Sequence, residues 1–233
     1  MLKLDKTPNK PTVIEGFPGV GLVASIVTEY LIEHLNAKLI GKIILENMPP
    51  IVAIHNREIV QPFGIFYSEN KNILLIHGLT MAKGFEWDLS DNIIELCNKT
   101  NTQHMISIEG VPARTQSPKT YFYTTSKKYK KNLEELGAKP LENGIVLGVT
   151  SSLLIKNEKV PQTCLFVETH MGLPDSKSAA LIVKDLNKIL ELNVDVKPLI
   201  NKAQEFEKKL KKILSSAKNA SDVKRQKEMN YVG

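Results

Sequence analysis

The sequence contains little cysteine and few aromatic residues, and each shortage excludes a class of protein. Its 233 residues include two cysteines, one tryptophan and 6% aromatic residues. Cys97 and Cys164 lie far apart and have no CxxC partner, so we expect two reduced, buried thiols and no disulfide framework. No cluster of cysteine and histidine supplies the roughly four ligands of a structural zinc site. We therefore predict no metal site and no cofactor.

Long hydrophobic runs are also missing. Apolar segments such as 73–76 have the length of a strand, whereas a helix that spans a bilayer needs about 20 apolar residues. The lysines among the first eleven residues are not followed by the apolar segment of a secretion signal. We therefore predict a cytoplasmic protein that makes no contact with a membrane.

Basic residues outnumber acidic residues, which gives a formal net charge of +6. Many of the basic residues fall at 127–131, 208–212 and 218–227, on expected helices and in the C-terminal segment. Most of them are lysines, and no aromatic residues lie between them to form a platform for stacking bases. We therefore predict no nucleic-acid partner. The two remaining interpretations are solvated helix faces and attraction to an acidic protein surface.

Strand-like and helix-like segments alternate along the first 196 residues. We expect strands near 12–15, 39–45, 51–54, 65–67, 72–77, 105–109, 121–123, 145–149 and 164–168, and helices near 22–35, 88–98, 126–136 and 175–190. The two short apolar runs at 51–54 and 65–67 flank a polar stretch and indicate an antiparallel excursion. Residues 110–113 are expected to break the strand at 105–109. This order predicts an α/β protein with helices on both faces of a mainly parallel sheet, as one domain over residues 1–196.

The segment 197–217 predicts a separate amphipathic helix. Its apolar residues follow steps of four and three, as in a heptad pattern, at Leu199, Ala203, Phe206, Leu210, Ile213 and Ala217. We assign Leu199, Phe206, Leu210 and Ile213 to packing against the domain or a neighbouring subunit. Residues 218–233 are polar and basic, which is typical of a flexible tail. Large side chains return only near its end, at Met229, Tyr231 and Val232, beside Gly233.

A glycine loop gives the sharpest hypothesis of an enzyme. The segment 19–24 matches the G-x-G-x-x-A pattern of dinucleotide-binding loops, after an expected strand and before an expected helix. Gly19 and Gly21 would bring backbone amides to a phosphate, and Glu46 would bind a ribose. Pro18 within the turn weakens this match, as does the spacing of 25 residues from Gly21 to Glu46, where about 20 is usual.

The alternative role of the glycines is structural. Gly16, Gly19 and Gly21 would let the first helix approach the first strand closely. No other catalytic arrangement is apparent: the five histidines fall on separate elements, and neither a G-x-S-x-G elbow nor a Walker loop is present. We therefore predict no catalytic residues and a protein that is not an enzyme.

Several segments, taken in order, resemble archaeal members of the proteasome assembly chaperone 2 family. The resemblance is carried by residues 15–25, 46–50, 108–113, 144–148 and 164–169, of which GFPGVGLV is the most specific. It implies a three-layer α/β/α sandwich akin to nucleoside phosphorylases and hydrolases, without enzymatic activity. It also implies homo-oligomers that bind proteasome α subunits or the assembled α-ring.

The resemblance further implies a docking motif at the C-terminus, in which a hydrophobic residue, a tyrosine and one more residue insert between neighbouring α subunits. In this chain the tyrosine is third from the end and Asn230 precedes it, so the last carboxylate is displaced by about one residue, ~3.3 Å. We assign docking to Met229, Tyr231, Val232 and Gly233. The predicted function is a protein-binding chaperone that assists assembly of, or docks on, the α-ring. The alternatives are a nucleotide-binding enzyme and an oligomeric scaffold without a proteasome role.

Overall fold

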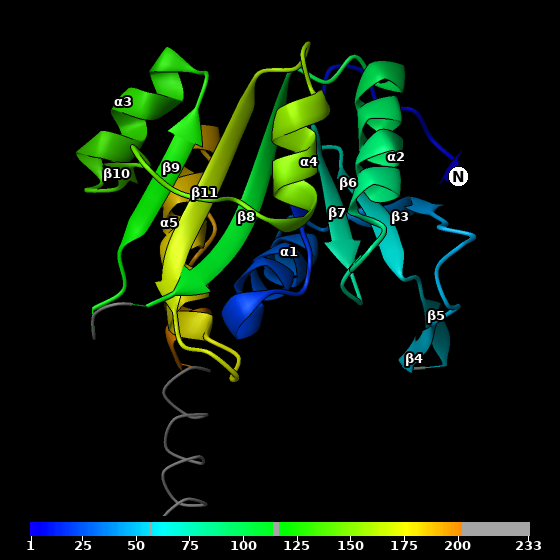
Figure 1. The fold of residues 1–233 in the computed structure, drawn as a ribbon, viewed down its shortest axis with the longest axis horizontal. Helices are drawn as coiled ribbons and strands as arrows, with labels where there is room; N and C mark the ends of the chain where they lie inside the picture. The colour runs from blue at the N-terminus through cyan, green and yellow to red at the C-terminus, as the bar shows by residue number, and fades with distance from the viewer. Residues whose placement is uncertain (56, 114–116, 202–233) are drawn as a thin grey trace, which may run out of the picture.

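One nine-stranded sheet forms the centre of the molecule (Figure 1). The computed structural model describes residues 1–55, 57–113 and 117–201. The sheet has the strand order β1-β3-β6-β7-β2-β8-β11-β9-β10. Its strands are β1 (Leu2–Leu4), β2 (Thr12–Gly16), β3 (Lys38–Ile43), β6 (Phe63–Ser68), β7 (Ile73–Gly78), β8 (His104–Pro112), β9 (Thr120–Thr124), β10 (Lys139–Pro140) and β11 (Gln162–Thr169).

The sheet is mixed, which corrects the expectation of a mainly parallel one. Strands β7, β2, β8 and β11 are parallel neighbours at the centre, whereas β1, β3, β6 and β9 join through antiparallel pairs. The central strands are apolar along most of their length because helices cover both of their faces, and every residue of β11 is buried. Continuous apolar runs of this kind are visible in the sequence, but the direction of each strand is not.

Helices cover both faces of the sheet. On one face, α1 (Val23–His34) packs against α5 (Ser176–Leu190), and α3 (Lys127–Glu135) packs on α5 near the edge. On the other face, α2 (Glu86–Lys99) packs against α4 (Gly148–Lys156). The predicted α/β sandwich with helices on both sides is therefore confirmed. None of the described helices is long and apolar enough to cross a membrane.

The predicted strand at 145–149 is wrong. Ile145 and Leu147 are 91% and 75% exposed, so this apolar run faces outward instead of entering the sheet. Helix α4 begins at Gly148, and its buried residues Val149 and Leu153 follow the spacing of four that one helical face requires. This helix was not among those that the sequence pattern predicted.

Strand β8 also differs from its expected end. It continues through Gly110 and Val111 to Pro112, where residues 110–113 were expected to break it. Proline is tolerated there because β2 pairs with β8 only as far as Ser107, so Pro112 has a neighbouring strand on one side only. Gly110 lies against η1 (Val20–Leu22), where a Cβ would be 2.1 Å from the carbonyl oxygen of Val20.

The antiparallel excursion has a different pairing from the one expected. Strand β6 contains the predicted residues 65–67, but it pairs with β3 and β7 in the main sheet. The run at 51–54 contributes instead to a separate hairpin of β4 (Ala53–His55) and β5 (Glu58–Val60). Ile54 and Ile59 face each other across this hairpin and are 76% and 63% exposed.

The predicted C-terminal helix is described only at its start. Residues 197–201 are helical, and Leu199 is 2% exposed within the core that α1 and α5 share. This residue packs on the domain itself. Phe206, Leu210 and Ile213 lie outside the described residues, as does the predicted tail.

Candidate functional site

The glycine loop leaves the carboxyl end of β2 and leads through η1 into α1. A Cβ at Gly16 would lie 2.7 Å from the carbonyl oxygen of Ala24, so strand and helix touch at this point. Gly21 has a φ of +66°, and a Cβ there would lie 2.1 Å from Oγ1 of Thr169. Close packing therefore accounts for Gly16 and Gly21. Gly19 has more room, since a Cβ there would meet no atom closer than Oε2 of Glu109, at 3.7 Å.

A second loop, between β11 and α5, meets the glycine loop at the same edge of the sheet. The backbone N–H of Asp175 donates to the carbonyl oxygen of Gly21 at 2.9 Å. The Asp175 carboxylate caps α5 by accepting from the Ser178 N–H at 2.9 Å, and it also accepts from Oγ1 of Thr169 at 2.8 Å. Burial raises the pKa of Asp175, but these hydrogen bonds outweigh burial and hold the pKa below its ordinary value.

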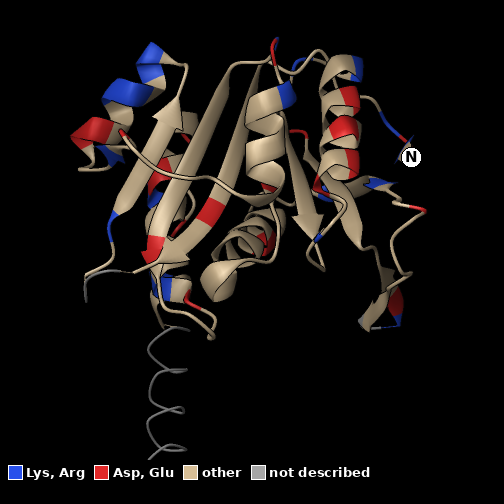
Figure 2. Ribbon diagram, viewed as in Figure 1, with Lys and Arg blue, Asp and Glu red and all other residues tan. Residues whose placement is uncertain are grey.

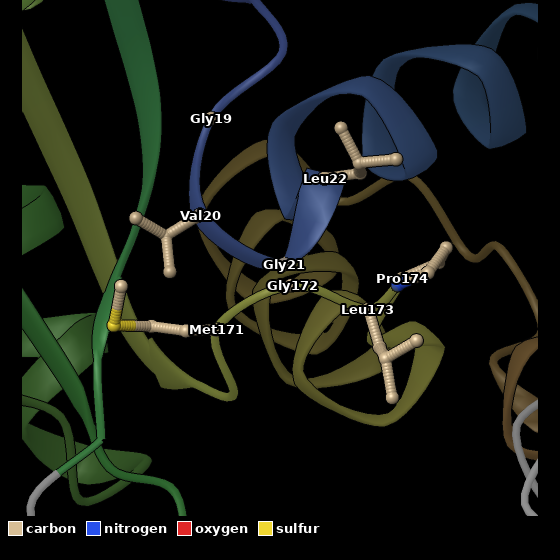
Figure 3. A pocket seen from close by; sticks show the side chains of 8 residues that line it. All are labelled: Gly19, Val20, Gly21, Leu22, Met171, Gly172, Leu173 and Pro174. Carbon is tan, nitrogen blue, oxygen red and sulfur yellow. The ribbon is translucent and has the colours of Figure 1, made fainter.

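An open hollow of about 330 Å³ lies between these two loops (Figure 3). Figure 3 shows Val20 and Met171 on one side of the loops and Leu22 and Leu173 on the other. The hollow is lined by Gly19, Val20, Gly21, Leu22, Met171, Gly172, Leu173 and Pro174, none of which is charged. Leu22, Met171 and Leu173 are 40%, 75% and 41% exposed. An exposed apolar edge of this kind is more typical of a protein contact than of a phosphate site.

The strand order does not bring Glu46 to the glycine loop. In a dinucleotide-binding fold, the acidic residue ends the strand next to the first strand. In this sheet β6 and β7 lie between β3 and β2, and three strand spacings amount to about 14 Å. Glu46 is exposed in the turn after β3. The nucleotide hypothesis therefore lacks its ribose-binding acid.

The structure brings together two glutamates, Glu15 and Glu109, that no sequence motif marked as a site. Each precedes a glycine at the carboxyl half of a central strand, Gly16 in β2 and Gly110 in β8. Thr150 of α4 donates to Oε1 of Glu109 at 2.8 Å and lies 3.4 Å from Oε1 of Glu15. A glutamate inside an apolar strand was the available signal, since such a residue is rarely buried without a specific environment.

Exposed charge gathers on the helices at the two sides of the molecule (Figure 2). Helix α3 carries four exposed lysines, at Lys127, Lys128, Lys130 and Lys131, next to the edge formed by β9 and β10. The charged residues of helix α2 are mainly acidic. Within the described residues, no group of three or more histidine, cysteine or acidic side chains is arranged to hold a metal ion.

The architecture is similar to that of solved archaeal proteins, one of which is described as a homolog of proteasome-assembly chaperone. The structure of PbaA from Pyrococcus furiosus, described as an archaeal homolog of proteasome-assembly chaperone, is similar with a TM-score of 0.84 and 28% identity over 99% of each chain. PbaB of the same organism, described as an archaeal proteasome activator, has a similar fold with a TM-score of 0.79. It is 22% identical and covers 91% of this chain and 98% of its own.

Sequence comparison gives the particular family. The PAC2 family matches residues 13–214, so the chain belongs to the PAC2 family. A relative in Methanocaldococcus jannaschii, the uncharacterized protein MJ0106, is 28% identical over 206 residues, covering 87% of this chain and 85% of the relative. The resemblance found in the sequence, carried by the glycine loop and the segments that follow it, is confirmed at the level of the family.

Proposed function

We propose that this protein is a cytoplasmic, protein-binding chaperone that assists assembly of the proteasome core particle or docks on its α-ring. The observation that carries the proposal is the similarity to PbaA over 99% of both chains, together with membership of the PAC2 family. The protein acts on its partner by binding and not by catalysis, and it works as a homo-oligomer.

The environment of Glu15 and Glu109 supports a role without catalysis. Two close carboxyl groups are a common arrangement for acid–base chemistry, which needs a substrate within hydrogen-bond reach. Glu15 is 1% exposed and lies beneath α4, in contact with Thr150. Glu109 is partly buried, and its Oε2 lies 3.7 Å from a Cβ position on Gly19, but the residues that line the hollow at the loop edge are themselves uncharged. Packing is therefore the better account of this region.

The docking element we propose is the C-terminal group Met229, Tyr231, Val232 and Gly233. A tyrosine beside apolar residues supplies an anchor that buries a large area and keeps a polar end. The lysines of α3 add an electrostatic contribution, because a cluster of positive charge steers an acidic partner and raises the association rate. The two features make separate predictions, since an anchor acts mainly on dissociation and steering acts mainly on association.

The test is direct binding of purified α subunits, and of assembled α-rings, to the full chain in a surface-based kinetic assay. A chain ending at Asn230 removes the anchor and should lose most of the binding. The double variant Lys128→Glu/Lys131→Glu should slow association and weaken its dependence on salt. A matched double variant, Lys3→Glu/Lys38→Glu, reverses two exposed lysines near the opposite edge of the sheet and should bind as the unmodified chain does.

Each alternative has its own outcome. If the full chain binds neither α subunits nor rings but is an oligomer by light scattering, the scaffold without a proteasome role replaces the chaperone. If ATP, NAD or a nucleoside raises the melting temperature, the nucleotide-binding enzyme replaces the chaperone as the proposed function. A ligand at 100 times its dissociation constant adds about 2.7 kcal/mol to the free energy of unfolding, which a thermal melt detects easily.

A further inference from the structure

Glu15 and Glu109 lie close together on the face of the sheet that α2 and α4 cover. Glu15 pairs with Ser107 across β2 and β8, and Glu109 follows Ser107 by two residues, so the two side chains share one face. Both carboxyl groups lie within reach of a single hydroxyl, that of Thr150, at 3.4 and 2.8 Å. The pair therefore forms the polar contact between the sheet and the first turn of α4.

The pair has little to balance its charge. A hydroxyl carries one proton, so Thr150 donates to only one carboxylate at a time. Among the described residues, no ion pair involves either glutamate. The other titratable group beside them is the buried thiol of Cys164, which faces both glutamates from β11 and is itself uncharged. His77 of β7 points to the opposite face, where it bonds to Thr28 of α1.

Both glutamates keep their protons at pH values well above the ordinary range for a carboxyl group. Burial, followed by repulsion from Glu109, raises the pKa of Glu15 to about 8. Burial raises the pKa of Glu109 to about 7. Because the two groups interact, these values describe the pair more than either residue. The pair therefore passes from fully protonated to doubly charged as the pH rises through neutrality.

Helix α4 is reached through an exposed strap, residues 141–147, which leaves β10 and passes across β9 and β11 in Figure 1. Its apolar side chains Ile145 and Leu147 face solvent. The strap joins α4 at Gly148, which has a φ of +75° and no atom within 4 Å of a Cβ position. At its other end the strap is held to β9, where the Leu141 N–H donates to the carbonyl oxygen of Phe122 at 2.8 Å. At the α4 end, the contact between Thr150 and the glutamates is the side-chain hydrogen bond that joins the helix to the sheet.

We infer that the two glutamates form a proton-dependent latch, which keeps the start of α4 and the strap seated on the sheet while protonated and releases them when both carboxyl groups ionise. Two hydroxyls, from Thr150 and from Ser107 beside Glu15, carry no positive charge and offset little of two negative charges at this site, so ionisation of both carboxyl groups draws in water. We expect this water to enter beside Gly148, where a Cβ would meet no atom within 4 Å. The latch would thus change how Ile145 and Leu147 are presented to a partner.

The latch is tested by hydrogen–deuterium exchange on the full chain at about pH 6 and about pH 9, with rates corrected for the intrinsic effect of pH. The hydrogen-bonded amides here, that of Leu141 in the strap and those of residues 152–156 in α4, should lose protection at the higher pH. The double variant Glu15→Gln/Glu109→Gln should keep the same protection at both values. Glu95→Gln, an exposed carboxyl group of α2, is the matched control and should behave as the unmodified chain does.

Trp87 provides a second readout, because it is the only tryptophan and lies on α2 beside α4, with Nζ of Lys156 5.1 Å from its ring. Its fluorescence should titrate near neutrality in the unmodified chain and lose that step in the double glutamine variant. Thr150→Val should move the step to higher pH, since the Thr150 hydroxyl lowers the pKa of both glutamates. Equal protection at both pH values in the unmodified chain, or a step that persists in the double variant, would overturn the latch.

Discussion

Gly21 and Thr169 approach so closely that a Cβ on Gly21 would lie 2.1 Å from Oγ1 of Thr169. This contact locks the glycine loop to the end of β11, and Gly21 also has a φ of +66°. Replacing Gly21 by alanine should therefore combine a left-handed backbone with a steric clash. We expect Gly21→Ala to lower the free energy of unfolding by roughly 2–4 kcal/mol, as measured by urea denaturation.

Gly84 is the matched control for this substitution. Its φ is +84°, but nothing lies within 4 Å of a Cβ at that position. Gly84→Ala should therefore show only the backbone effect, about 1 kcal/mol. Equal losses at the two sites would mean that the loop adjusts freely and that Thr169 does not restrain it.

The two cysteines should be unreactive in the folded protein. Burial raises the pKa of Cys97 to about 11 and that of Cys164 to about 12, and both side chains are almost completely buried. The thiolate is the reactive form, so a thiol reagent at neutral pH should find almost none of it in the native state. We expect no modification by Ellman's reagent without denaturant and two equivalents in urea.

Single serine variants at Cys97 and Cys164 assign any signal to one site. A fast reaction of one thiol in native buffer would show that the elements packed around it open readily. In that case, comparison of the rate with the global unfolding rate would separate local opening from unfolding.

Helix α4, which the sequence analysis did not predict, offers a matched pair of neighbouring positions. Leu153 is completely buried against the sheet, whereas Ile155 is 67% exposed. We expect Leu153→Ala to lower the free energy of unfolding by about 2–5 kcal/mol. Ile155→Ala should change it by no more than about 0.5 kcal/mol. Similar losses at both positions would contradict the placement of this helix.

The segment around α4 also shows why part of the fold was not predictable. The run from Ile145 to Val149 is apolar and β-branched, which is typical of a buried strand. Exposure of such residues cannot be inferred from local periodicity, because it depends on where the chain passes over the sheet. The helix is only nine residues long and contains threonine and serines, so its own pattern is weak.

The longer elements were predictable because burial on one face imposes a regular pattern. The strands around Val13, Leu75 and Val167 and the helices α1, α2 and α5 are close to their expected positions. The family also followed from the glycine loop and the segments after it. The pair of Glu15 and Glu109 could not be predicted from the sequence, since their proximity depends on the parallel pairing of β2 and β8. That pairing joins segments more than 90 residues apart, and it leaves no local signal.

Asp185 provides a further prediction, on the pH dependence of stability. This residue of α5 is 4% exposed, and its Oδ2 atom has no hydrogen-bond partner among the described residues. Burial raises its pKa to about 7 from an ordinary value of 3.8. Between these values the folded state holds the proton more tightly than the unfolded state does. The stability that this group contributes is therefore complete at low pH and is lost as the pH rises through about 7.

We expect Asp185→Asn to increase the free energy of unfolding at pH 8 by roughly 1–3 kcal/mol, because the amide carries no charge to bury. Near pH 4.5 the gain should shrink, since the native aspartate is then protonated. Urea denaturation at the two pH values measures the difference. Asp5→Asn, at an exposed position, should show no such growth with pH. Because Glu15 and Glu109 titrate in both chains, their contribution cancels in the comparison. A gain that is equal at both pH values would show that the aspartate stays charged through a contact with solvent.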